Sequence, residues 1–291
     1  MADSYHIPVL PEHTLHYLFP KKANVIVDAT FGFGGHSRLI LDKIADGHLI
    51  AIDQDEEVLN LARKNFKNKN IEFVNDNFRN LTEILTRLKE PKVDAILADL
   101  GISSYHFDLA NRGFSFKDDE LDMRLSKELA VSAYEIVNST NEKELADLLY
   151  NLADEYKSRR IAKCIVENRR KQKIESAKQL SEIILRCVGS KSKINPSTKT
   201  FQALRIAVND EFQALNQFLN QAVGCLKPGG RLVVISFHSG EDRIVKTIFK
   251  QLEKEELVDI LTKKPIIADL GEIRSNPRSR SAKLRAVIRR K

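Results

Sequence analysis

The first hundred residues alternate short apolar runs with longer amphipathic segments. Segment 56–66 has the length and spacing of a crossover helix, and the apolar runs expected to form strands are 24–28, 48–53, 71–74 and 93–99. Continuous apolar runs of this kind are typical of strands that are buried on both faces of a parallel sheet. Their alternation with helices predicts an open α/β fold.

The pattern changes after the fourth strand, because three successive windows place apolar residues at i, i+3, i+4 and i+7 with no strand between them. These helical windows are 145–152, 161–168 and 180–187. Asn141 and Ser176 precede two of them as N-cap candidates. Strand-like patterning resumes after the third window, with a helix over 200–226, a turn over 227–230, and strands over 231–237 and 281–290. We therefore expect a sheet domain formed by 1–108 and 200–291, with a helical domain inserted at 109–199.

The composition is that of an ordinary globular protein. The 291 residues are 42% hydrophobic and 30% charged, which argues against collagen-like, low-complexity and disordered classes. No apolar run approaches the roughly 20 residues that span a bilayer, and residues 1–11 lack the basic start and apolar stretch of a signal peptide. We expect a protein of the cytoplasm with no membrane partner.

Cysteine usage agrees with a reducing compartment. The three cysteines are Cys164, Cys187 and Cys225, an odd number at wide spacings, so the sequence predicts neither a disulfide framework nor a Cys-x-x-Cys metal site. Cys164 and Cys187 lie on apolar helical stripes, where we expect buried structural thiols.

The positive charge is concentrated in two segments. The chain carries a formal charge of +7; residues 274–291 contribute +8 with no acidic residue, and residues 157–173 contribute +7 with Glu167 as their single acid. The remainder of the chain is therefore acidic, at −8. Two separate basic patches on an acidic body predict contact with a polyanion such as RNA, and segment 157–173 could instead be a solvated helix face.

A glycine-rich loop follows the first strand, in the segment Val27–Ser37, and precedes a helix. Glycines allow a tight turn and a close approach of backbone to a ligand. A dinucleotide site would need a third glycine where Ser37 stands, and the Asp28 carboxylate would repel a pyrophosphate. S-adenosylmethionine, which has no phosphate and carries positive charge, therefore fits better than a nicotinamide cofactor.

Polar groups also follow the next three strands. Asp53 suits ribose hydroxyls, Asp76–Phe78 offers a polar contact and a ring for an adenine, and Asp99 follows the fourth strand. Ligands of open α/β sheets bind at the carboxyl ends of the strands, so these groups form one candidate site. Each aspartate could instead cap a helix.

The sequence resembles a known family, the bacterial small-subunit (16S) ribosomal RNA cytosine-N4 methyltransferases of the RsmH (MraW) type. The resemblance covers nearly the whole chain and rests on the segments 6–10, 28–37, 76–79, 99–104, 112–116, 121–124, 200–209, 236–239 and 276–281. It implies a class I methyltransferase sheet with a helical substrate-recognition insertion. It also implies methyl transfer from S-adenosylmethionine to the exocyclic amine of a cytidine in the decoding region.

The resemblance assigns roles to individual residues. Gly34, Gly35 and His36 would line the methionine and ribose of the cofactor, Asp53 the ribose hydroxyls, Phe78 the adenine, and Asp99 the reactive end, where it would also be catalytic. His106 stands where the family usually has a cofactor-contacting glutamine, with Tyr105 in place of a proline. Gly240 replaces a usual leucine, and residues 173–177 depart from the usual Pro-Ile-x-Thr-Thr.

Several histidines and aromatic residues have competing interpretations. His13 and His16 could bind metal, although a surface or packing role is the stronger hypothesis. His238 with Ser239 and Glu241 could suggest a hydrolase triad, but no nucleophile elbow accompanies it, which favours a substrate-side contact. Phe114 and Phe116 could stack a base or pack in the core.

The overall function also has alternatives. A non-enzymatic RNA-binding protein would explain the basic patches but not the strand-end groups, and a nicotinamide-dependent oxidoreductase would need the missing glycine. The resemblance leaves open whether the substrate is small-subunit ribosomal RNA or the assembled small subunit, and whether the chain forms a homodimer.

Overall fold

The computed structural model describes residues 7–20, 23–44, 46–66, 70–102, 111–189 and 195–290. The chain divides into two compact units, which we call the sheet unit (1–103 and 212–291) and the helical unit (104–211). The sequence predicts the boundaries between the two units at 108/109 and 199/200. The second boundary differs most, because helix α10 (Thr198–Asn209) packs against α7 (Glu142–Ala153) and so belongs to the helical unit.

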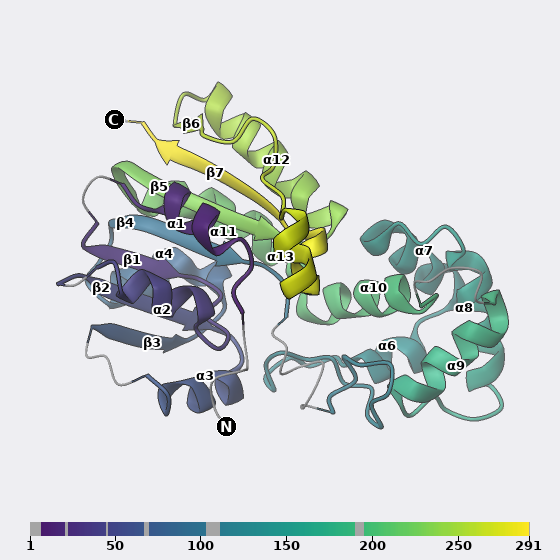
Figure 1. Cartoon of the computed structure of the whole chain (residues 1–291). Helices are drawn as coiled ribbons and strands as arrows, with labels where there is room; N and C mark the ends of the chain where they lie inside the picture. Colours follow the sequence, from purple (N-terminus) through teal and green to yellow (C-terminus); the bar gives the residue numbers. More distant parts are fainter. Residues whose placement is uncertain are drawn as a thin grey trace. The chain divides into compact units, whose positions relative to one another are not determined.

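The described residues of the sheet unit form a seven-stranded sheet in the order β3-β2-β1-β4-β5-β7-β6 (Figure 1). The strands are β1 Val25–Asp28, β2 His48–Asp53, β3 Ile71–Asn75, β4 Val93–Asp99, β5 Leu226–Ser236, β6 Val258–Ile260 and β7 Lys283–Arg289. The first five are parallel, and β7 pairs antiparallel with both β5 and β6. The predicted α/β fold is therefore confirmed.

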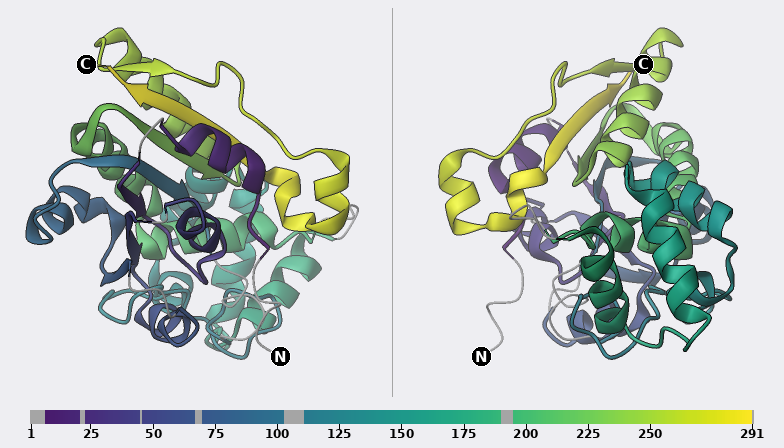
Figure 2. Two further views of the ribbon diagram at one scale, coloured as in Figure 1. Left: turned by 60° about the vertical axis from the view of Figure 1, so that its left-hand side comes forward. Right: turned by 90° about the vertical axis from the view of Figure 1, so that its right-hand side faces the viewer.

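Helices cover both faces of this sheet (Figure 2). They are α1 Pro11–Leu18, α2 Gly35–Leu41, α3 Glu56–Arg63, α4 Leu81–Arg87, α11 Glu211–Cys225, α12 Ser239–Lys254 and α13 Leu270–Ser275, with short 3-10 turns η1 Phe78–Asn80 and η2 Pro277–Ser281. Strand residues alternate between two cores. For example, Val27 packs with α4, α11 and α12, whereas Ile26 packs with α1 and α2. The central strands are thus buried on both faces, as their continuous apolar runs predict.

Three element predictions needed correction. The single helix expected over 200–226 is two helices, since Asp210 adopts a left-handed conformation (φ 49°) that ends α10 before α11 begins. The predicted turn 227–230 lies inside β5: Val93 pairs with Leu226 and Ala95 with Arg231, so the four residues bulge from the ladder. Strand β6 was missed, because three residues carry almost no periodic signal.

The helical unit contains α6 Ala133–Ser139, α7, α8 Ser158–Arg169, α9 Ala177–Val188 and α10 among its described residues. The predicted N-caps are confirmed: Asn141 accepts from the Glu144 amide, and Ser176 accepts from the Gln179 amide. The irregular segment before α6 is held by α10, because the Asn209 side chain accepts from the Leu125 amide and donates to the Met123 carbonyl, both at 2.8 Å.

The structure corrects the expectation of unpaired thiols in the helical unit. Cys164 on α8 and Cys187 on α9 form a disulfide with a Cα–Cα distance of 6.3 Å. The two helices pack side by side, so residues 23 apart in sequence face each other, which their spacing alone could not reveal. Cys225 is the free cysteine of the described residues and is buried.

Candidate active site

The carboxyl ends of the parallel strands bring the predicted acidic residues to one edge of the sheet. In the sheet register Asp28 pairs with Ala51 and Leu97, so Asp53 and Asp99 extend two residues beyond it on the neighbouring strands β2 and β4. Asp28, Asp53 and Asp99 therefore flank the loop that leaves β1. This is the location where open α/β sheets bind ligands.

The glycine loop is tightly packed against aromatic rings. Gly34 has a φ of 72°, and a Cβ atom there would lie 2.3 Å from Cζ of Phe66. Phe31, Phe66 and Phe73 pack edge to face beneath the loop, with Phe31 5.2 Å from each of the other two ring centroids. Residue 34 must therefore be glycine, and Gly35 begins α2 directly after it.

Asp28 is a buried carboxyl group at the end of β1. It is 1% exposed, and it accepts hydrogen bonds from Ser37 Oγ at 2.6 Å and from the Thr30 amide at 3.3 Å. Burial raises the pKa of Asp28 to about 6, although the hydrogen bond from Ser37 and the nearby His36 act in the opposite direction. Asp28 thus ties the loop to the first turn of α2.

His36 and Asp99 form a second buried pair. His36 Nε2 lies 3.4 Å from Asp99 Oδ2, with the side chains 5% and 14% exposed. The backbone amide of Asp99 donates to Thr30 Oγ at 2.6 Å, which fixes the end of β4 against the loop. Among the described residues, His36 Nδ1 and Asp99 Oδ1 have no hydrogen-bond partner. Buried polar atoms without partners are costly, so this pair has the character of a site that a ligand completes.

Asp53 also supports the loop. Its carboxylate accepts from the Gly32 amide at 2.8 Å and from the Asp55 amide at 2.9 Å. These two bonds hold the Asp53 carboxylate at the carboxyl end of β2, beside the loop. Phe78 begins η1 and is half-buried, with its ring 5.1 Å from that of Phe218. His106, the remaining predicted cofactor contact, lies outside the described residues.

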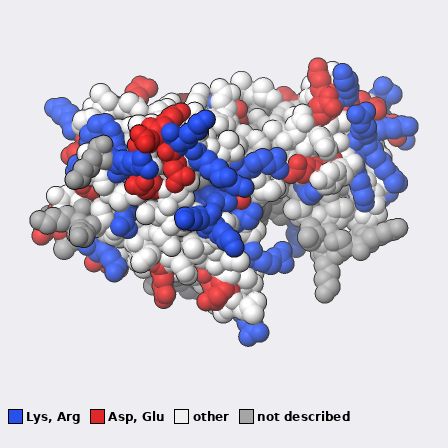
Figure 3. Space-filling view, turned by 90° about the horizontal axis from the view of Figure 1, so that it is seen from above, with Lys and Arg blue, Asp and Glu red and all other residues white. Residues whose placement is uncertain are grey.

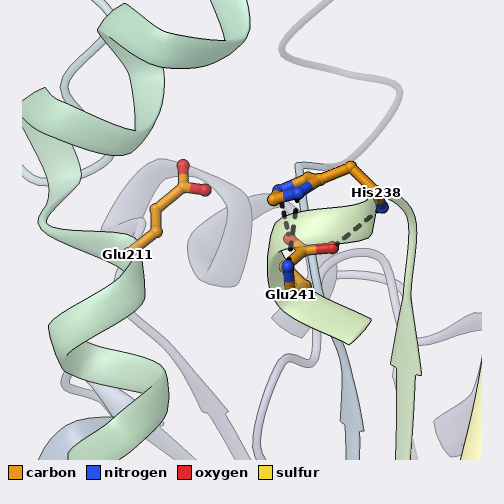
Figure 4. A group of neighbouring side chains, drawn as sticks. All are labelled: Glu211, His238 and Glu241. Carbon is orange, nitrogen blue, oxygen red and sulfur yellow. Dashed lines mark hydrogen bonds and ion pairs between the residues drawn. The ribbon is translucent and has the colours of Figure 1, made fainter. Parts of the chain in front are cut away.

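His238 follows β5 at the same edge of the sheet and caps α12 (Figure 4). Its Nδ1 accepts from the Glu241 amide at 3.3 Å, and the Glu241 carboxylate accepts from the amides of Phe237 and His238. The geometry is that of a helix capping box and not of a hydrolase triad. A Cβ at Gly240 would lie 2.6 Å from Cζ of Phe212, so the glycine leaves room for that ring.

The other candidates have structural settings. His13 and His16 are exposed on α1 and, among the described residues, belong to no cluster of three metal-ligating side chains. Phe114 is 4% exposed and Phe116 packs against Phe201 with ring centroids 4.7 Å apart, which favours core packing over base stacking.

Sequence reasoning missed two supports of the site. Thr30 accepts from the Asp99 amide, and Ser37 donates to Asp28. Both lie within the glycine-rich segment, but the sequence spacing of a hydroxyl residue in a loop does not predict its hydrogen-bond partner. The aromatic cluster beneath Gly34 was also missed, since Phe66 lies in the connection after α3 and Phe73 lies on β3.

Comparison with known proteins identifies the family. The family model described as the MraW methylase family matches residues 3–290. The chain belongs to this family. A ribosomal RNA small subunit methyltransferase H from Endomicrobium trichonymphae is 44% identical over 284 residues, covering 97% of this chain and 98% of that protein. One from Clostridium botulinum strain Kyoto is 46% identical over 300 residues, covering 96% and 97%.

Among solved structures, a methyltransferase homologue from Pyrococcus horikoshii is 16% identical, with a TM-score of 0.45 and coverage of 94% of this chain and 64% of that one. Within the described residues, no helix is both long and apolar enough to cross a membrane. The family and the curated relatives make this chain a methyltransferase, and they set aside the oxidoreductase and the non-enzymatic alternatives.

Proposed function

We propose that the chain transfers a methyl group from S-adenosylmethionine to the exocyclic N4 amine of a cytidine in the decoding region of small-subunit ribosomal RNA. The names of the relatives support the RNA class, because proteins 44–46% identical over nearly the whole chain are named ribosomal RNA small subunit methyltransferase H. The observation that carries the N4 chemistry is the Asp99 carboxylate, which is buried at the end of β4 with Oδ1 unpartnered among the described residues. We infer that the reaction takes place in the cytoplasm, where ribosomal RNA is found.

The residues at the sheet edge fit the proposed methyl donor. The loop around Gly34 presents backbone without a Cβ, and among the described residues His36 Nδ1 is buried without a hydrogen-bond partner. The Asp53 carboxylate, a hydrogen-bond acceptor, ends β2 at the same edge of the sheet. Gly34, Gly35, His36, Asp53, Phe78 and Asp99 would hold the cofactor. Bound there, S-adenosylmethionine supplies an activated methyl group on a positively charged sulfur, and the acidic edge of the sheet favours that charge.

A cytosine amine is a poor nucleophile, because its lone pair is delocalised into the ring. Asp99 Oδ1 can accept a hydrogen bond from the amine, which orients the nitrogen and increases its electron density. The contact of His36 with Oδ2 restrains the carboxylate, so Asp99 is positioned before substrate arrives. When the nitrogen takes the methyl group, the methyl–sulfur bond would break and the sulfur would leave as a neutral thioether. The amine would then be cationic, and Asp99 Oδ1 would stabilise that charge and receive the proton.

Replacing Asp99 tests this role. We expect Asp99→Ala to lower kcat at saturating cofactor by at least about a hundredfold, the usual scale for loss of a positioned acid–base group. The kcat of Asp99→Asn, which keeps one acceptor oxygen, should lie between that of the natural chain and that of Asp99→Ala. Methyl transfer from radiolabelled S-adenosylmethionine to small subunits and to bare ribosomal RNA gives the rates.

Calorimetry with S-adenosylmethionine provides the control, because it separates loss of cofactor binding from loss of catalysis. A normal kcat for Asp99→Ala would refute the assigned role. Absence of S-adenosylmethionine binding by the unmodified chain would refute the proposed function as a whole.

A further inference from the structure

Two exposed tyrosines lie together in the helical unit. Tyr156, in the connection between α7 and α8, is 79% exposed, and Tyr150 on α7 is 49% exposed. Their rings pack edge to face with centroids 6.1 Å apart. Neither ring contributes to the apolar core of the unit, so the pair has no evident role in folding.

The rings are held in place by polar contacts. Lys199 on α10 extends its ammonium group to 5.1 Å from the centroid of Tyr156 and donates to the Asp154 carbonyl at 2.7 Å. Asp154 ends α7 in a left-handed conformation, and its amide donates to the Tyr150 carbonyl at 2.9 Å. The amide of Lys157 donates to Glu155 Oε1 at 2.9 Å. Because the turn is already ordered, a ligand that binds the rings has little conformational entropy to remove.

Positive charge surrounds the pair. Lys157, Arg159 and Arg160 follow Tyr156 within four residues and are exposed, and Lys163 is exposed one turn further along α8. Lysine and arginine side chains gather on the helical unit, at the right of the view in Figure 3, with acidic side chains beside them. Along the chain, the acidic residues nearest the two tyrosines are Asp147, exposed one turn before Tyr150 on α7, Asp154, which is half-buried, and Glu155, which is buried.

Not every basic residue of this segment contributes to the surface. Arg169 is half-buried, and its guanidinium donates to the carbonyls of Val137 and Thr140, which ties α8 to the end of α6. The exposed cations of this segment that are closest to Tyr156 in sequence are therefore at the start of α8. The base of a nucleotide has a π-face that can stack on a tyrosine, and the phosphates of the RNA backbone attract the adjoining cations.

We infer that Tyr156 and Tyr150 form a stacking platform for an unpaired base of the RNA substrate, with Lys157, Arg159 and Arg160 contacting the adjacent phosphates. The inference rests on the proposed function for its choice of RNA. It specifies a single-stranded segment, because the faces of bases inside a duplex are already covered by their neighbours.

A tryptophan reporter tests stacking directly, because the natural chain contains no tryptophan. Tyr156→Trp keeps a flat aromatic ring and supplies a unique fluorophore. We expect its emission to be quenched on titration with a single-stranded oligoribonucleotide of the target region. Inorganic polyphosphate, which offers the charge without bases, should leave the emission nearly unchanged. Val131→Trp is the matched control, since Val131 is 47% exposed elsewhere in the same unit.

Affinity measurements separate stacking from charge. Tyr156→Ala should weaken binding of the same oligoribonucleotide about tenfold, with the salt dependence of binding unchanged. Tyr156→Phe should bind within about twofold of the natural chain, because the ring is retained. The slope of log K against log salt is negative. Replacing both Arg159 and Arg160 by alanine should make it shallower by about 1.4, or about 0.7 for each lost phosphate contact with a single strand.

The outcomes also distinguish this inference from the proposed function. Equal quenching by polyphosphate and RNA, or unchanged RNA affinity in Tyr156→Ala, would overturn the platform while methyl transfer by the natural chain remained intact. Loss of binding to assembled subunits without loss of binding to bare RNA would assign the surface to a protein partner and would also overturn it. RNA binding that depends on Tyr156 in a chain without methyl-transfer activity would instead refute the proposed function alone.

Discussion

At the scale of single residues, the least ordinary group in the sheet unit is the buried carboxyl of Asp28. Its pKa is raised to about 6 by burial, from 3.8. The folded protein therefore binds the proton more tightly than the unfolded chain does, so this residue lowers stability as the pH rises from about 4 to about 6. A shift of this size corresponds to about 3 kcal/mol.

Asp28→Asn removes the titration while keeping the shape of the side chain. In the absence of cofactor, we expect the free energy of unfolding of the variant, relative to that of the natural chain, to increase by about 3 kcal/mol in total between about pH 3 and pH 7 and then to level off. Urea unfolding at a series of pH values measures the difference. A difference that does not change with pH would show that Asp28 has the same pKa in the folded and unfolded states, and would contradict the raised pKa.

The positions of the acidic residues could be predicted, but their partners could not. Asp28, Asp53 and Asp99 each end a strand, and the common edge of parallel strands brings them together. That Asp53 also holds the Gly32 amide, and that His36 faces Asp99, depends on the path of the loop in three dimensions. Loop geometry of this kind has no periodicity in the sequence.

At the scale of elements, helices with clear caps and apolar stripes were predicted well. Asn141 and Ser176 begin α7 and α9 as expected, because short polar side chains satisfy the free amides of the first turn. The break at Asp210 was missed, since neither proline nor glycine marks it. The link between α8 and α9 was missed as well, because two apolar stripes show that helices pack but not which residues meet.

The Cys164–Cys187 disulfide makes a measurable prediction. Denatured but unreduced protein should contain one reactive thiol, that of Cys225, and reduction should expose three. Reduction of the native protein should lower the free energy of unfolding by about 3 kcal/mol, the value expected for a closed loop of this size.

Thiol titration and urea unfolding, each with and without reductant, measure these two quantities. Cys164→Ala should unfold like the reduced natural chain and should not respond to reductant. Three reactive thiols in denatured protein that was never reduced would contradict the pairing.

At the scale of the whole molecule, the two basic segments have different roles. In the C-terminal segment, Lys283 and Arg285 both contact Asp242, and Arg290 pairs with Asp259. Arg289 donates to backbone carbonyls at the end of α11 and the start of β5. Much of the charge of this segment therefore stabilises the sheet, and among its described residues Arg274, Arg278 and Arg280 are exposed. The distribution of basic residues along the sequence located both segments, but it could not show which groups each basic side chain contacts.

The proposed methylation of the N4 amine of a cytidine can be checked through the chemical identity of the product. Unmodified small subunits would be incubated with the chain and with S-adenosylmethionine that carries a deuterated methyl group. The ribosomal RNA would then be digested to nucleosides and analysed by mass spectrometry against methylcytidine standards. We predict labelled N4-methylcytidine. A label at C5 or on the ribose, or no labelled nucleoside at all, would contradict the account.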